Sequence, residues 1–105
     1  MTEQATMQEQ IKQTVSDNKV VLFMKGNANF PQCGFSGKAV QILTALDAEF
    51  VTVDVLSNDQ VREGVKAYSN WPTIPQLYIN GEFVGGSDIM NEMYEAGELK
   101  DTLSV

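Results

Sequence analysis

The segment KVVLFMK at residues 19–25 constrains the fold of this chain more than any other stretch. It is short, rich in β-branched residues and apolar without alternation, which is the pattern of a β-strand buried on both faces. Strands of this kind occur in sheets that helices cover on both sides. We therefore expect an α/β protein.

The rest of the chain alternates between helix and strand patterns. The first strand-helix-strand unit predicts a parallel pair with a right-handed crossover, and Asn80-Gly81 predicts an antiparallel hairpin. Ser57, with Gln60 three residues later, predicts a capping box, and Ser87 is a second candidate N-cap. Together these patterns predict a four-stranded mixed sheet flanked by helices on both faces. The predicted helices are residues 3–17 and 34–46, the segments after Ser57 and Ser87, and a turn at 98–103; the predicted strands are 19–25, 50–55 and two within 76–84.

Length and composition set limits on location and partners. We expect the 105 residues to form one domain, 1–105, and no run approaches the ~18 apolar residues of a membrane span. A single cysteine fits a reducing compartment, and the N-terminal MTEQATMQEQ lacks the pattern of a secretory signal or transit peptide. We therefore predict a cytoplasmic protein without a membrane partner.

Charge and residue types exclude several kinds of site. The net charge of -7, from 14 acidic and 7 basic residues, argues against a nucleic-acid partner. The chain has no histidine, which excludes the familiar zinc sites and Cys-His pairs. Any chemistry must therefore come from the single thiol, carboxylates, lysines, backbone amides or a group taken from solution.

The single cysteine, Cys33, lies in the segment FPQCGFSGK between a loop and a predicted helix start. Backbone N–H groups and the positive dipole at a helix N-terminus stabilise a thiolate, so we predict a partly exposed thiol with a lowered pKa. The alternative is an inert, buried cysteine. Ser36 stands where a C-x-x-C motif has its second cysteine. Phe35 could shield the sulfur or form a partner surface, and the preferred prediction is a first-turn core aromatic.

Four motifs resemble one family in the same order along the chain. The segments Lys25-Gly26, PQCGFS at 31–36, YSNWPTIPQLY at 68–78 and GGSD at 85–88 are similar to those of monothiol glutaredoxins of the CGFS type. The resemblance runs from about residue 7 to residue 103. It implies a thioredoxin-like fold, which the predicted elements match, and a glutathione site beside Cys33.

The resemblance also implies a ligand set for glutathione. Lys25 and Arg62 would meet the glycyl carboxylate, the backbone at Thr73-Ile74-Pro75 would pair with the cysteinyl unit beside a cis-proline, and Ser87-Asp88 would meet the γ-glutamyl end. The alternatives are solvated charges, a rigid turn and a simple helix cap. Lys38 and Lys66 would add positive charge without being ligands.

Three functions are considered at this level; the first is the primary prediction, because CGFS members are generally poor in oxidoreductase assays. Members of the CGFS family are associated with a glutathione-dependent homodimer that carries a [2Fe-2S] cluster, with a BolA-like partner and with apo iron-sulfur proteins. In that reading Cys33 is the metal ligand of each chain, and the role belongs to iron-sulfur cluster assembly and cell redox homeostasis. The second reading is a monothiol glutathione-disulfide oxidoreductase with Cys33 as catalytic residue. The third is a thioredoxin-like interaction module with an idle cysteine.

Overall fold

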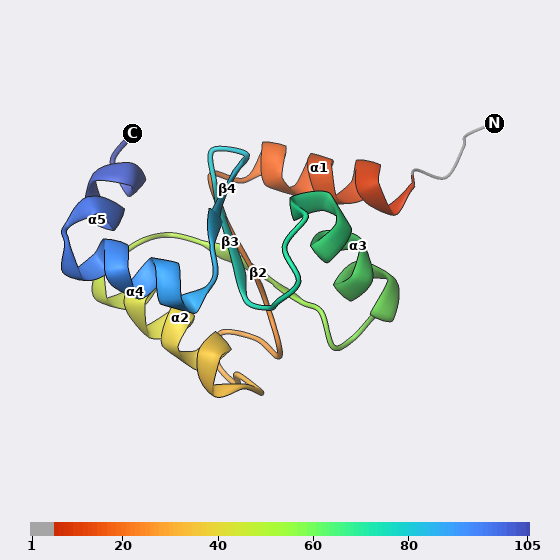
Figure 1. Cartoon of the computed structure of the whole chain (residues 1–105), viewed down its shortest axis with the longest axis horizontal. Helices are drawn as coiled ribbons and strands as arrows, with labels where there is room; N and C mark the ends of the chain where they lie inside the picture. Colours follow the sequence, from red (N-terminus) through yellow and green to blue (C-terminus); the bar gives the residue numbers. More distant parts are fainter. Residues whose placement is uncertain (1–5) are drawn as a thin grey trace.

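A computed structural model describes residues 6–105, which form a four-stranded sheet with helices on both faces (Figure 1). Among these residues no helix is long and apolar enough to cross a membrane. The elements in chain order are α1 (Met7–Asp17), β1 (Val20–Met24), α2 (Gly34–Ala45), β2 (Val51–Asp54), α3 (Asp59–Ser69), β3 (Gln76–Ile79), β4 (Glu82–Gly85), α4 (Ser87–Glu95) and α5 (Glu98–Leu103).

The strand order in the sheet is β2-β1-β3-β4. β1 pairs in parallel with β2 and antiparallel with β3, and β3 pairs antiparallel with β4 across the Asn80-Gly81 turn. The predicted mixed sheet is therefore confirmed. β1 is flanked on both edges, and all five of its residues are buried, as its apolar run predicts.

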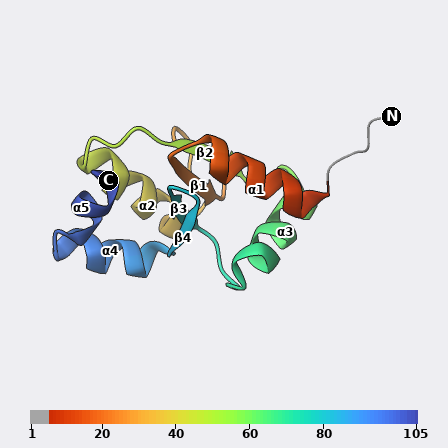
Figure 2. The ribbon, with the colours of Figure 1, turned by 90° about the horizontal axis from the view of Figure 1, so that it is seen from above.

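The helices form two layers, with α1 and α3 on one face of the sheet and α2, α4 and α5 on the other (Figures 1 and 2). Alternate residues of β1 point to opposite faces, as the strand period requires. Val20, Leu22 and Met24 pack with the α2–α4–α5 layer. Val21 and Phe23 pack with the α1–α3 layer, so one strand anchors both cores.

Three helix starts differ from the sequence predictions. Residues 3–5 of the first predicted helix lie outside the described residues, and Thr6 caps α1 through a capping box with Glu9. Ser57 is not the N-cap of α3: its hydroxyl donates to the Asp54 carbonyl at 2.8 Å, and the Asn58 side chain accepts from the Gln60 N–H instead. Gly86 takes the N-cap position of α4, so Ser87 is the first helical residue.

This topology brings three chain segments to one edge of the sheet. The carboxyl end of β1 continues through the loop that leads to α2, and the carboxyl end of β4 leads to α4. Because β3 runs antiparallel to β1, the loop before β3 reaches the same edge. Crevices at such strand ends are preferred places for ligand sites in α/β proteins.

Candidate functional site

A cleft of about 450 Å³ lies at this edge of the sheet. Its walls come from the ends of β1 and β4, the N-terminal parts of α2, α3 and α4, and the loop before β3. All eight site residues predicted from the sequence line it: Lys25, Cys33, Arg62, Thr73, Ile74, Pro75, Ser87 and Asp88. Residues separated by up to 63 positions in the chain therefore share one surface.

Cys33 is the N-cap residue of α2 and is only partly buried. The backbone N–H of Ser36 is the largest influence on the Cys33 thiol and lowers its pKa. Burial acts in the opposite direction, while the Phe35 N–H, the Lys25 charge and the Ser36 hydroxyl lower the pKa further. The predicted exposed thiol with a lowered pKa is confirmed, and the inert buried cysteine is not what the structure shows.

Ser36 connects the cysteine to the end of β1. Its side chain is fully buried, and its Oγ accepts a hydrogen bond from the Lys25 backbone N–H at 3.0 Å. This contact ties the first turn of α2 to the residue that follows β1. The serine in the place of a second cysteine is thus a structural link beside the reactive sulfur.

The loop of residues 71–75 forms a second wall of the cleft. The Ile74-Pro75 peptide bond is cis, and the Ile74 side chain is buried in the α1–α3 core. Within residues 6–105 the backbone N–H and C=O of Ile74 make no hydrogen bond. The cleft therefore contains a backbone donor and an acceptor that have no partner in the part of the chain that the structure describes.

Ser87 and Asp88 are the first two residues of α4 and form a third wall. Among the described residues no side chain caps this helix, so its first N–H groups are available to an anion. Gly86 allows α4 to approach the loop: a Cβ atom there would lie 3.2 Å from the Pro75 carbonyl oxygen. The Asp88 carboxylate adds a negative charge beside these donors.

Arg62 and Lys66 bring positive charge from α3, but both have carboxylate neighbours. Arg62 Nη2 lies 3.4 Å from Asp59 Oδ1, and Glu63 Oε2 lies 3.5 Å from both Arg62 Nε and Lys66 Nζ. Arg62 Nε is buried and has no hydrogen-bond partner within residues 6–105, because its approach to Glu63 lacks hydrogen-bond geometry. A ligand carboxylate in the cleft would supply the acceptor that this nitrogen lacks.

The cleft contrasts with the rest of the molecule in charge. Lys25, Arg62 and Lys66 line it, and Lys38 lines an adjoining groove next to Cys33, so four of the seven basic residues gather here. The lining of both surfaces includes one acidic residue, Asp88, out of the 14 in the chain. Anionic ligands are therefore favoured at this place on an acidic protein.

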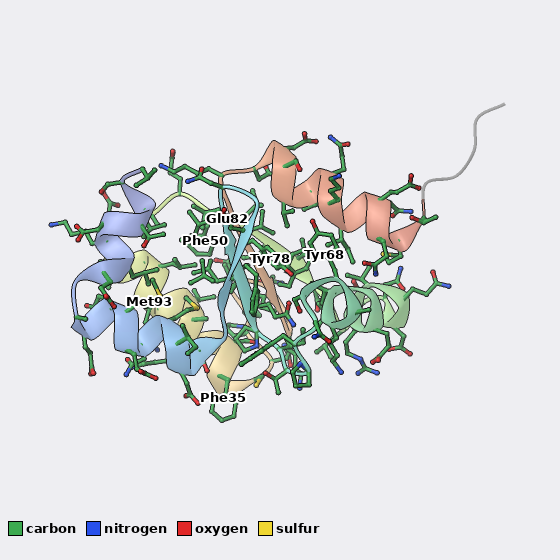
Figure 3. The ribbon with its side chains drawn as sticks, turned by 45° about the horizontal axis from the view of Figure 1, so that its top comes forward. Phe35, Phe50, Tyr68, Tyr78, Glu82 and Met93 are labelled. Carbon is green, nitrogen blue, oxygen red and sulfur yellow. The ribbon has the colours of Figure 1, made fainter. Side chains whose placement is uncertain are left out.

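Sequence reasoning missed part of the lining. Trp71, the only tryptophan, and Ile89 on α4 both face the cleft and stay 40% and 37% exposed. Phe35 is not a core aromatic: it is 64% exposed and projects from the N-terminal end of α2 (Figure 3). The signal for Trp71 was its place directly before Pro72, in the same sequence segment as the predicted site residues Thr73, Ile74 and Pro75.

Comparisons with known proteins place the chain in a family. A family model described as Glutaredoxin matches residues 20–84. A monothiol glutaredoxin of Synechocystis sp. is 60% identical over 90% of this chain and 89% of its own, and the chloroplastic monothiol glutaredoxin-S7 of rice is 57% identical over 92% of this chain and 58% of its own.

Solved structures agree with the sequence relatives. The solution structure of reduced poplar apo GrxS14 superposes with a TM-score of 0.83 at 52% identity, covering 93% of this chain and 90% of that one. The holo form of poplar glutaredoxin C1 has a TM-score of 0.84 at 25% identity over 93% of this chain and 86% of that one. The fold is thioredoxin-like, and the chain belongs to the glutaredoxin family, with monothiol glutaredoxins among its relatives, which supports a glutathione-related redox role.

Proposed function

We propose that this protein is a glutathione-dependent carrier of [2Fe-2S] clusters in iron-sulfur cluster assembly and redox homeostasis. The observation that carries the proposal is one activated thiol in a cationic cleft where a buried serine, Ser36, replaces the second thiol. A site built this way needs its second sulfur from outside the chain. Glutathione is a thiol with two carboxylates, so it supplies both the sulfur and the charge that this cleft favours.

The cleft fits the tripeptide in size and in donors. Its volume of about 450 Å³ is within the range of small-molecule sites. In the proposed pose, Lys25 and Arg62 hold the glycyl carboxylate, and the Ile74 backbone pairs with the cysteinyl unit. The free N–H groups of Ser87 and Asp88 hold the γ-glutamyl carboxylate while the Asp88 side chain meets the ammonium group.

The ligand chemistry favours a cluster shared between two chains. A [2Fe-2S] cluster takes four thiolates, and this chain has one cysteine. In residues 6–105 no group of three or more His, Cys, Asp or Glu side chains could hold a metal ion alone. Two copies of Cys33 and two glutathiones complete the ligand set, and the proposed holo form is therefore a homodimer.

A second function, glutathione-disulfide oxidoreductase, is favoured by the lowered pKa of the Cys33 thiol. In this reaction the Cys33 thiolate attacks the glutathionyl sulfur of a mixed disulfide and releases the protein thiolate. A second glutathione thiolate then attacks the Cys33–glutathione disulfide. Cys33 leaves as thiolate, and the two glutathiones leave as glutathione disulfide, so no second protein cysteine is needed.

Anaerobic reconstitution with iron, sulfide and glutathione distinguishes these functions. The carrier proposal predicts a visible chromophore and a dimer in solution, both lost when glutathione is omitted and in Cys33→Ser. A colourless wild type that rapidly deglutathionylates a model peptide supports the oxidoreductase and refutes the carrier. If the wild type shows neither a chromophore nor deglutathionylation, both functions are refuted, and a thioredoxin-like interaction module is the remaining function.

The proposal extends to partners and compartment. We propose a BolA-like protein and apo iron-sulfur proteins as partners, and mixing the loaded dimer with an apo ferredoxin tests delivery through the change in the visible spectrum. We propose the cytoplasm as the compartment, because a lone thiol fits reducing conditions. The rice relative is named as chloroplastic, so the compartment needs a direct test. Fractionation of the source cells tests it, and recovery of the protein in an organelle would contradict the proposed cytoplasmic location.

A further inference from the structure

The loop of residues 71–75 has few means of holding its own shape. Pro72 and Pro75 have no backbone N–H. Of the other three residues, Trp71 alone has a hydrogen-bonded N–H among the described residues, to the Lys66 carbonyl and the Ser69 hydroxyl at 3.1 Å each. The conformation of the segment with Thr73 and Ile74 must therefore be held by contacts other than backbone hydrogen bonds of the segment itself.

The side chain of Gln76, the first residue of β3, supplies that support. Gln76 is fully buried, and its Nε2 donates to the Trp71 carbonyl at 3.0 Å and to the Thr73 carbonyl at 3.1 Å. One amide group thus joins both sides of the turn at Pro72. The two donors of the amide are both used, as a buried amide requires.

Tyr78 holds the amide from the other end. Its hydroxyl donates to Gln76 Oε1 at 3.4 Å, and the residue is 2% exposed. The ring packs against Phe23, Tyr68 and Phe83 with centroid distances of 5.6, 6.0 and 5.5 Å, and Figure 3 shows it between the sheet and α3. Burial raises the pKa of Tyr78 to about 12, so its hydroxyl remains a donor over the whole physiological range.

We propose that Gln76 is a positioning residue for the glutathione site, and that its buried amide fixes the Thr73-Ile74 backbone in the conformation that receives the tripeptide. This inference rests on the proposed glutathione site. Gln76 touches neither the thiol nor the cleft, since it is absent from the residues that line the cleft. Its effect reaches the ligand through the two loop carbonyls alone.

The test is an NMR titration of the full chain with S-methylglutathione, which has no thiol to exchange with Cys33. Gln76→Met keeps a side chain of similar length but removes both donors. We expect it to weaken binding about tenfold, which lies within the range expected for the loss of two hydrogen bonds to the loop carbonyls. The pKa of the Cys33 thiol should not move, because its N–H donors lie on α2.

Leu77→Ala is the matched control. Leu77 is the next residue along β3, is fully buried and packs into the opposite core, so its truncation destabilises the fold without touching the loop. We expect its affinity to stay within about twofold of the wild type at a temperature where all variants are folded. A loss of affinity in Leu77→Ala equal to that in Gln76→Met would reduce Gln76 to a general stability role and overturn the inference.

The remaining outcomes separate the two proposals. No saturable shift in the wild type refutes the glutathione site and, with it, this inference. Binding by the wild type with unchanged affinity in Gln76→Met overturns the inference alone. If Gln76→Met does not fold, Tyr78→Phe serves as the second variant, because it removes the hydroxyl that orients the Gln76 amide. We expect Tyr78→Phe to lose about threefold in affinity for S-methylglutathione. Wild-type affinity in this variant would overturn the inference.

Discussion

Replacing Ser36 with alanine separates two roles of the first turn of α2. The substitution removes the Oγ that accepts the Lys25 N–H at 3.0 Å but keeps the backbone N–H that most lowers the pKa of Cys33. Because Ser36 has no exposed surface, no water replaces the lost acceptor directly. We expect a loss of about 1–2 kcal/mol in the free energy of unfolding, or about 5–10 °C in Tm.

The pKa of Cys33 should change little in Ser36→Ala. The hydroxyl is the smallest of the influences that lower the pKa, so the thiol should still titrate below an ordinary cysteine, which has a pKa of ~8.5. The rate of alkylation by iodoacetamide against pH measures this directly, because Cys33 is the only thiol in the chain. Urea unfolding followed by circular dichroism measures the stability.

Ser57→Ala is the control for Ser36→Ala. Ser57 also makes one hydroxyl hydrogen bond, to the Asp54 carbonyl at 2.8 Å, but it is exposed, and we expect a loss below about 0.5 kcal/mol. A thiol pKa that returns to the ordinary value in Ser36→Ala would show that the side chain, not the helix backbone, activates Cys33. Unchanged stability in Ser36→Ala would show that the hydrogen bond between the Lys25 N–H and Ser36 Oγ does not contribute to the free energy of unfolding.

Three further perturbations follow from individual contacts. Burial raises the pKa of Tyr78 to about 12, so the contribution of its neutral hydroxyl to stability is complete below pH ~10 and is lost as the pH rises toward 12. In alkaline unfolding titrations the free energy of unfolding should therefore fall by about 2–3 kcal/mol more in the wild type than in Tyr78→Phe. Equal decreases in the two proteins would contradict this. Gly26→Ala should lower the free energy of unfolding by about 2 kcal/mol or more, because φ at Gly26 is +88° and a Cβ atom there would lie 2.5 Å from the Phe30 carbonyl oxygen. A Tm within 2 °C of the wild type, roughly 0.4 kcal/mol, would refute the predicted steric conflict. Lys25→Gln should weaken S-methylglutathione binding about three- to tenfold and reduce the salt dependence of this binding. Lys12→Gln, at an exposed position on α1, should do neither. Equal effects of the two substitutions would show that the net charge of the protein, and not a contact of Lys25, favours the ligand.

Element types were predictable where one local pattern dominates. The unbroken apolar run of β1 has no polar face to offer water, so its burial between two helical layers follows from composition alone. The Asn80-Gly81 hairpin follows in the same way from residues that accept positive φ, and φ is +54° and +82° there. These features depend on few neighbours, which is why sequence reasoning reaches them.

Helix starts were harder because adjacent residues compete for the same role. Ser57 and Asn58 both carry a side-chain acceptor suited to an N-cap, and the choice depends on the Asp54 carbonyl, which takes the Ser57 hydroxyl. At α4 the close approach of the loop carbonyl of Pro75 selects Gly86 as N-cap. Both outcomes depend on tertiary neighbours that local spacing does not reveal.

The eight predicted residues share one surface, but the rest of the cleft lining and the contacts that support it were not predicted. The eight lining residues came from motifs, and the topology brings them to one edge of the sheet. Of the two carboxylates beside Arg62, only that of Asp59, three positions before it, was within reach of spacing rules, because adjacent helix residues such as Glu63 are not expected to face each other. The buried amide of Gln76 was not, since strand patterns predict apolar residues at buried positions.

The central claim is that glutathione supplies the sulfur that this chain lacks. Native mass spectrometry of the reconstituted protein measures this most directly, by counting chains, clusters and glutathiones in one particle. We expect two chains, one [2Fe-2S] cluster and two glutathiones, with the whole assembly absent in Cys33→Ser. A cluster-bound particle without glutathione, or a cluster that persists in Cys33→Ser, would contradict it.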